Sequence, residues 1–275
     1  MKSELYTLRH LPNVLIVAIL AVMMAGISAV LQWALPFLLK IDPPQVGDSP
    51  TGQQVQALID GSDPTTSSFQ LAALDITGSG QSTGISIFLI AIVALTITAA
   101  SYPFSSGAVV WKVVGAGSRM KWASSLIVAV LNTVLLVCVA ACVLNSLIAL
   151  VAAPMNDVSL VASASNVAVV WLRGSLAVLL LTLAIIGVVL AIRRIGPAIG
   201  VIVAVLMAGV ILGTIGVMAA WEPYLYSWLP SSAVSIAGGQ GATQTMNPWV
   251  GIAVLAGWSV VSMGLGLTRF YRANL

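Results

Sequence analysis

Charge is what this sequence has least of. Only 7% of its 275 residues are Asp, Glu, Lys or Arg, whereas 59% are hydrophobic, and the mean hydropathy is +1.06. In a soluble globular domain about a quarter of the residues are charged. A chain of this length cannot bury so much apolar surface against itself, so lipid must solvate most of it. The composition therefore predicts an integral membrane protein.

The side chains that carry most enzyme chemistry are also scarce. There is one histidine, His10, and the two cysteines, Cys138 and Cys142, lie four positions apart inside an apolar run. Neither pattern supplies the ligand set of a zinc site, so we expect no bound metal. The chain has no G-x-x-x-x-G-K-[ST] phosphate loop, and we therefore expect no nucleotide-hydrolysing site, no catalytic residue and no cofactor of its own.

Six apolar segments are each long enough to cross a bilayer as a helix, which takes roughly 20 residues. They cover approximately residues 14–38, 84–102, 123–151, 166–190, 197–220 and 249–268. Two arginines and a Gly-Pro pair separate the fourth segment from the fifth, and we expect a tight polar turn there because Pro disfavours helix in the residue before it. The sequence predicts one all-α transmembrane domain with six spans.

Basic residues set the orientation of such a chain, because they accumulate on the cytoplasmic side. With the N-terminus inside, nine of the eleven basic residues lie inside: Lys2, Arg9, Lys112, Arg119, Lys121, Arg193, Arg194, Arg269 and Arg272. All the acids except Glu4 then lie outside. We therefore expect both termini in the cytoplasm. Because orientation accounts for the basic residues, we expect no nucleic-acid partner.

The segments between the spans differ in character. Residues 41–82 are rich in Gly, Ser, Thr, Asp and Pro. Residues 53–59 and 69–76 fit short surface helices, but a solvated outer loop is the favoured interpretation. Residues 103–122 form the one sizeable cytoplasmic connection. Residues 221–248 begin with Trp, Tyr and Pro residues, which suit the membrane interface.

The first twelve residues predict a short amphipathic helix. Leu5, Leu8 and Leu11 have helical spacing, with charged residues between them. Such a segment fits the surface of the inner leaflet.

Arg173 is the exceptional charge, because it lies several residues inside the outer end of the fourth span. A charge at that depth costs a few kcal/mol unless it is paired or reaches the headgroups. Asp157 and Glu222 are the candidate partners on the same side, in an outer gate or ion pair. Simple snorkelling of the side chain to the headgroups remains an equal alternative.

The fifth span is rich in glycine and carries two G-x-x-x-G pairs, Gly196/Gly200 and Gly209/Gly213. Such pairs allow a neighbouring helix to approach closely. That neighbour is either another helix of the same chain or a helix of a second chain.

The layout resembles the permease subunits of type-2 ABC exporters, especially the small actinobacterial ones. Two segments carry the resemblance beyond topology. The first is Tyr102-Pro103-Phe104-Ser105-Ser106-Gly107-Ala108-Val109-Val110, running on through Arg119 and Lys121, which is similar to the family's E-[YF]-x-x-G-x-[IV]-R segment. The second is Leu229-Pro230-Ser231-Ser232-Ala233, similar to L-P-[SN]-x-[AG].

The resemblance implies that 103–122 is a loop that couples to an ATPase. Phe104, Gly107 and Val109 match the family motif, whereas Pro103 and Val110 replace its acid and its arginine. The remaining candidates for contact with the ATPase are Trp111, Lys112, Arg119 and Lys121. A second permease chain that holds the standard motif is one explanation for the departures.

The implied function is export of an apolar or amphipathic cargo, such as a peptide antibiotic, a drug or a lipid, across a bacterial plasma membrane. Partner ATPase subunits bind ATP and Mg, two permease chains surround the path, and residues 221–248 form an outer re-entrant element. The alternatives are a membrane scaffold without a path of its own and a secondary carrier. The absence of paired carboxylates in the spans counts against a proton-coupled carrier.

Overall fold

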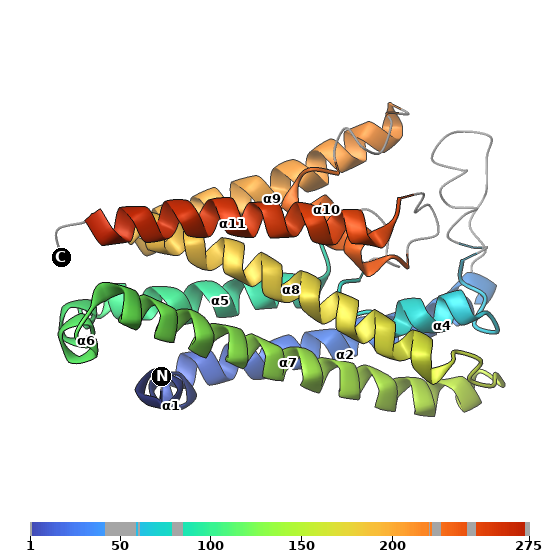
Figure 1. Ribbon diagram of the computed structural model, residues 1–275. Coiled ribbons are helices and arrows are strands. Elements are labelled where there is room, and N and C mark those ends of the chain that lie inside the picture. Colours follow the sequence, from blue (N-terminus) through green and yellow to red (C-terminus); the bar gives the residue numbers. More distant parts are fainter. Residues whose placement is uncertain are drawn as a thin grey trace.

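The computed structural model describes residues 2–41, 59, 61–78, 85–219, 221, 227–240 and 246–272. All regular structure within these ranges is α-helical (Figure 1). Six helices are long and apolar enough to cross a membrane. They are α2 (Pro12–Ile41), α5 (Ile87–Ser105), α7 (Arg119–Met155), α8 (Ala164–Ile192), α9 (Ile195–Met218) and α11 (Pro248–Arg272). The expectation of a helical multi-pass membrane protein is confirmed.

Each long helix contains most of one predicted span, and most extend a few residues beyond it at both ends. Local sequence explains several of the boundaries. The hydroxyls of Ser86, Ser118 and Ser163 accept a hydrogen bond from the backbone N–H three residues later, at the starts of α5, α7 and α8. This is the usual arrangement of a helix N-cap. Pro12 and Pro248 are the first residues of α2 and α11, where the missing N–H costs no helical hydrogen bond.

Four short helices complete the described structure: α1 (Lys2–His10), α4 (Ser67–Leu74), α6 (Val109–Ala116) and α10 (Pro230–Gly238). The long helices run back and forth, so α1, α6, the α8–α9 turn and the C-terminal end of α11 lie at one end of the bundle (Figure 1). We call this the α6 end. The α4 helix lies at the opposite end, which we call the α4 end.

The α8 helix organises the bundle. It packs most extensively against α11 and also contacts α5, α7 and α10, while α2 packs against α5 and α7. The buried core runs along these contacts, from Trp122 and Phe270 at the α6 end to Ile76 at the α4 end. By contrast, α9 diverges from the rest of the bundle toward the α4 end (Figure 1). Much of its surface is exposed and apolar, which suits lipid or another protein chain.

The break between the fourth and fifth spans lies earlier than the Gly-Pro pair suggests. The α8 helix ends at Arg193, which adopts a left-handed conformation with φ 59°, and α9 begins at Ile195. Pro197 therefore lies within the first turn of α9, where its lack of an N–H is tolerated. The predicted tight turn exists, but Arg193 and Arg194 form it.

The described part of the segment after the first span contains a packed helix rather than a solvated loop. Residues 67–74 form α4, whose Phe69, Gln70, Ala73 and Leu74 are buried. Thr66 caps the helix by accepting a hydrogen bond from the Phe69 N–H at 3.3 Å. The favoured loop interpretation is thus wrong for this stretch. Of the other proposed surface helix, 53–59, only residue 59 lies within the described residues.

Candidate functional site

The α6 end contains the segment 103–122, which carries the predicted contacts with an ATPase. Its short helix α6 is joined to α5 and α7 by turns at Gly107 and Gly117, which have φ of 69° and 72°. These left-handed conformations favour glycine. The space around both residues is open, so backbone geometry rather than packing requires glycine here.

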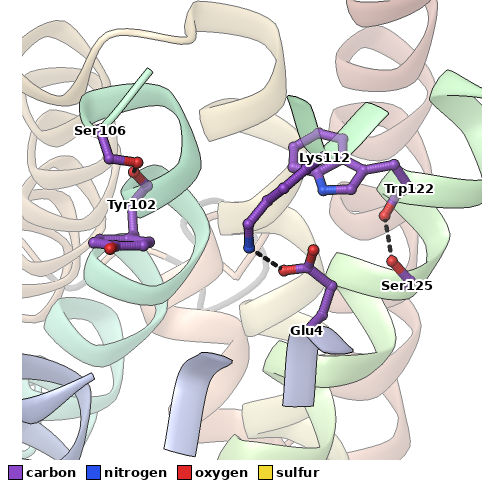
Figure 2. Close-up of polar contacts among 6 residues, drawn as sticks. All are labelled: Glu4, Tyr102, Ser106, Lys112, Trp122 and Ser125. Atoms are coloured by element: carbon purple, nitrogen blue, oxygen red, sulfur yellow. Dashed lines mark hydrogen bonds and ion pairs between the residues drawn. The ribbon is translucent and has the colours of Figure 1, made fainter. Parts of the chain in front are cut away.

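An ion pair fixes α6 to the N-terminal helix. The Lys112 ammonium donates to the Glu4 carboxylate at 2.7 Å, and the two side chains are 20% and 7% exposed (Figure 2). Glu4 comes from α1, so the bond ties the start of the chain to a helix more than a hundred residues later. Removal of one partner from a pair this shielded from water costs more than breaking an ordinary surface pair, because a partly buried charge is left unpaired.

A second bond joins the start of α7 to the end of α11. The Arg119 guanidinium donates to the Tyr271 backbone carbonyl at 2.8 Å. A cation near the last carbonyls of a helix also interacts favourably with the helix dipole. The contact links the loop segment to the C-terminal helix.

Three aromatic rings pack beneath these polar contacts. Phe104 meets Trp122 and Phe270 edge-on, with ring centroids 5.9 and 6.2 Å apart, and Trp122 lies 5.4 Å from Phe270. They come from α5, α7 and α11, and Trp122 and Phe270 are fully buried. The rings therefore hold three long helices together at the α6 end. Phe104 belongs to this core rather than to the surface.

The opposite face of α6 is exposed and apolar. Trp111 is 80% exposed, Val114 is 68% exposed and Val110 is 44% exposed, while Val109 is buried. Lys121 and Gly107 are also exposed. The predicted coupling residues thus fall into two sets. Phe104, Val109, Lys112 and Arg119 contact this chain, whereas Trp111, Lys121 and Gly107 remain available to a partner.

At the α4 end, Arg173 lies among groups from several parts of the chain. Its guanidinium donates to the Gly238 carbonyl at the end of α10. The carboxylate of Asp75, which is only 6% exposed, interacts electrostatically with it. Asp75 in turn accepts hydrogen bonds from the Thr77 N–H at 3.0 Å and the Thr77 hydroxyl at 2.5 Å. Arg173 is therefore a bridging residue rather than a free cation.

Neither predicted partner of Arg173 pairs with it among the described residues. Asp157 is exposed in the turn after α7, and no ion pair joins it to Arg173 within the described residues. Glu222 lies outside those residues. Sequence reasoning grouped Asp75 with the other outer acids and missed its role. Its position directly after the apolar stretch of α4 was the available signal.

Gln70 connects α4 to the α7–α8 connection. Its side-chain amide donates to the carbonyls of Pro64 and Ser159, at 3.1 and 2.9 Å, and its oxygen accepts from the N–H groups of Val161 and Ala162. The side chain is fully buried. Nearby, hydrogen bonds from the side chain and backbone of Thr65 lower the pKa of Asp63. These bonds order the surface at the α4 end.

The two glycine pairs of α9 differ in their surroundings: one packs within this chain and the other faces open space. Gly209 packs against α10 of the same chain, where the Ser231 hydroxyl donates to the Leu206 carbonyl at 3.0 Å. Gly213 is buried. Gly196 and Gly200 are exposed, and nothing in the described chain lies within 4 Å of the position of an added Cβ. This second pair is open to another chain or to lipid.

A close helix crossing involves glycines that sequence reasoning did not select. At Gly187 of α8, an added Cβ would lie 2.4 Å from the backbone carbon of Ser262 in α11. At Gly266 it would lie 2.3 Å from the Gly187 carbonyl oxygen. The Ser259 hydroxyl also donates to the Leu180 carbonyl at 2.6 Å. The spacing of Ser259, Ser262 and Gly266 along one face of α11 was the signal for this crossing.

The part of the chain that the structure describes contains no cluster of three or more His, Cys, Asp or Glu side chains. Cys138 and Cys142 are buried, free thiols of the core. His10 stacks on Tyr6, and both side chains are exposed on α1. The expectation that the chain holds no metal or cofactor stays a prediction.

Comparisons with protein families, with curated proteins and with solved structures returned no match to this chain. The resemblance to exporter permeases therefore rests on topology and on the two sequence segments.

Proposed function

We propose that this chain is the membrane-spanning permease subunit of an ATP-driven exporter in a bacterial plasma membrane. A separate ATPase subunit binds ATP and Mg, docks at the α6 end and drives rearrangement of the spans. The cargo is apolar or amphipathic, such as a peptide antibiotic, a drug or a lipid, because the spans offer few charged groups. A second permease chain completes the transport path.

The distribution of charge supports a cytoplasmic α6 end. The helices and turns at this end carry the basic residues Lys2, Arg9, Lys112, Arg119, Lys121, Arg193, Arg194, Arg269 and Arg272. The acids Asp63, Asp75 and Asp157 belong to the α4 end. Under the positive-inside rule this asymmetry supports a cytoplasmic location for both termini. In that orientation α1 would lie at the inner surface as an interfacial helix, and α10 would lie on the outer side as a re-entrant element.

One observation carries the proposal: α6 is anchored on one side and unoccupied on the other. The Lys112–Glu4 pair and the Arg119–Tyr271 bond connect α6 and its flanks to α1 and α11. The exposed face bears Trp111 and Val114, one helical turn apart. A short helix built this way transmits force from a docked partner to the spans. Exposed Trp is also a residue type that dominates the energy of protein interfaces.

The exposed glycine pair of α9 supports pairing of two permease chains. Gly196 and Gly200 lie four residues apart, with open space beside both. A G-x-x-x-G face allows close contact between helix backbones within the membrane. This is the surface of α9 that a second permease chain would use.

The proposal is tested by affinity purification in detergent from the native host. Wild-type protein should retain a nucleotide-binding subunit, and a Trp111→Ala, Val114→Ala variant should bind it roughly thirtyfold more weakly, since interface anchors are worth about 2 kcal/mol. Trp249→Ala is the matched control, because Trp249 is 57% exposed at the start of α11, at the other end of the bundle.

The alternatives give different results in the same preparation. A scaffold or a secondary carrier would purify without a nucleotide-binding subunit. Of these two, only the carrier would move cargo after reconstitution into vesicles. Retention of the ATPase by the α6 variant at the wild-type level would remove the proposed role of α6.

A further inference from the structure

An open pocket of about 270 Å³ lies at the α6 end, lined by Arg193, Thr268, Arg269 and Arg272. Arg193 ends α8, and the other three residues belong to the last turn and a half of α11. These two helices form the most extensive contact in the bundle. Their packing therefore brings together three guanidinium groups that are far apart in sequence.

The three arginines lack a counter-charge within the described chain. No salt bridge or side-chain hydrogen bond of Arg193, Arg269 or Arg272 occurs among the described residues. The Arg193 Nε is buried without a hydrogen-bond partner. The dipole of α11 favours a basic residue near the C-terminus of that helix. The dipole alone does not neutralise three positive charges.

The acids of the described residues do not neutralise the pocket. Among them only Glu4 belongs to the α6 end, and Glu4 is paired with Lys112. The pocket is therefore suited to an anion bound from outside the described part of the chain. Guanidinium groups bind phosphate and carboxylate oxygens with paired, charge-assisted hydrogen bonds.

The surface beside the pocket indicates which kind of anion would fit it. Val261 and Leu265 precede Arg269 at four-residue intervals on α11, and they are 58% and 60% exposed. This line of apolar side chains leads along a spanning helix directly to the guanidinium groups. A ligand with an apolar tail and an anionic head complements both features, whereas a soluble anion uses only one of them.

We propose that this pocket binds the phosphate of an anionic phospholipid, with Arg193, Arg269 and Arg272 contacting the headgroup and Val261 and Leu265 contacting an acyl chain. Basic pockets between spanning helices on the cytoplasmic side are suited to such headgroups. The inference does not depend on export activity. It needs only the α6 end to lie at a membrane surface, and the orientation proposed above puts the lipid in the inner leaflet.

The test is native mass spectrometry of the purified full-length chain, titrated with phosphatidylglycerol or with phosphatidylcholine of the same acyl chains. The wild type should bind one phosphatidylglycerol in clear preference to phosphatidylcholine. Arg269→Gln with Arg272→Gln should weaken this binding on the order of 25-fold, at about fivefold for each arginine near the surface. Arg194→Gln is the matched control, because Arg194 is exposed on the same turn and does not line the pocket.

A second variant separates binding from folding. Arg269→Lys with Arg272→Lys keeps both charges and should retain part of the preference, and melting temperatures without lipid show whether any variant is simply unstable. Equal binding of the two lipids, or undiminished binding by the glutamine variant, would overturn the proposal. An equal loss in Arg194→Gln would assign the effect to diffuse charge and also overturn it. Complete displacement of the lipid by millimolar inorganic phosphate would identify a soluble-anion site instead.

Discussion

The ion pair between Glu4 and Lys112 is an unusual use of charge in a chain that has so little. Glu4 is the sole acid among the first forty residues. Its carboxylate is almost completely buried, and the 2.7 Å bond to Lys112 compensates its desolvation. Removal of either partner leaves the other charge partly buried and unpaired, which is the costly situation for such pairs.

We expect Glu4→Gln and Lys112→Met each to lower the free energy of unfolding by about 1–2 kcal/mol. The double variant should lose clearly less than the sum of the two, because neither charge is then left alone. Thermal unfolding of the four proteins in detergent measures this coupling. Additive losses would show that the two residues act independently.

The side chain of Gln70 makes four hydrogen bonds to backbone groups, and we expect these bonds to stabilise the α4 end. Gln70→Leu would keep the volume but leave two carbonyls and two N–H groups without their partner. At about 1 kcal/mol for each lost bond we expect a loss of roughly 2–4 kcal/mol. The connections 61–66 and 156–163 should also be cleaved faster in limited proteolysis. Ser67→Ala, an exposed position on the same helix, is the control and should behave as wild type.

At the scale of helices, the crossing of α8 and α11 depends on the absence of side chains. The backbones meet at Gly187, Ser262 and Gly266, and the Ser259 hydroxyl bonds across the crossing. Small residues permit such contact in membranes, where packing and interhelical hydrogen bonds replace the hydrophobic effect. This crossing also positions the arginine pocket, since its residues come from the same two helices.

Gly187→Ala should therefore destabilise the fold, whereas Gly200→Ala should not. The added methyl at Gly187 would collide with the backbone of α11, and we expect a cost of about 1–3 kcal/mol from the forced separation. The methyl at Gly200 enters open space. Melting temperatures and yields of monodisperse protein compare the two variants. A Gly187→Ala protein as stable as wild type would contradict the described crossing.

The sequence was most informative about long helices, because twenty apolar residues in a row have few alternatives to a span. All six predicted spans are present as helices that are long and apolar enough. The sequence was least informative about which helices pack together, since hydropathy does not say which face of a helix contacts which neighbour. Gly187 and Asp75 became important only through groups supplied by distant segments. The α4 helix was undervalued because its surroundings in sequence are polar.

At the scale of the whole molecule, the segregation of charge between the two ends predicts which end faces the cytoplasm. Most of the proposed function depends on this orientation. The proposed ATPase docking face and the proposed inner-leaflet lipid site both require the α6 end to face the cytoplasm. Cys138 and Cys142 are 0% and 2% exposed, so the native thiols give little background in labelling experiments. Single introduced cysteines therefore report topology without removal of the native ones.

Gly115→Cys and Ser165→Cys are suitable probes, because both positions are exposed and lie at the α6 end and the α4 end respectively. Around Gly115 nothing lies within 4 Å of an added Cβ, so the substitution should not disturb α6. A membrane-impermeant maleimide added to intact spheroplasts should label Ser165→Cys and not Gly115→Cys, and inverted vesicles should give the reverse. The positive-inside distribution is the physical reason. Labelling of Gly115→Cys from outside would invert the topology and exclude docking of a cytoplasmic ATPase on α6.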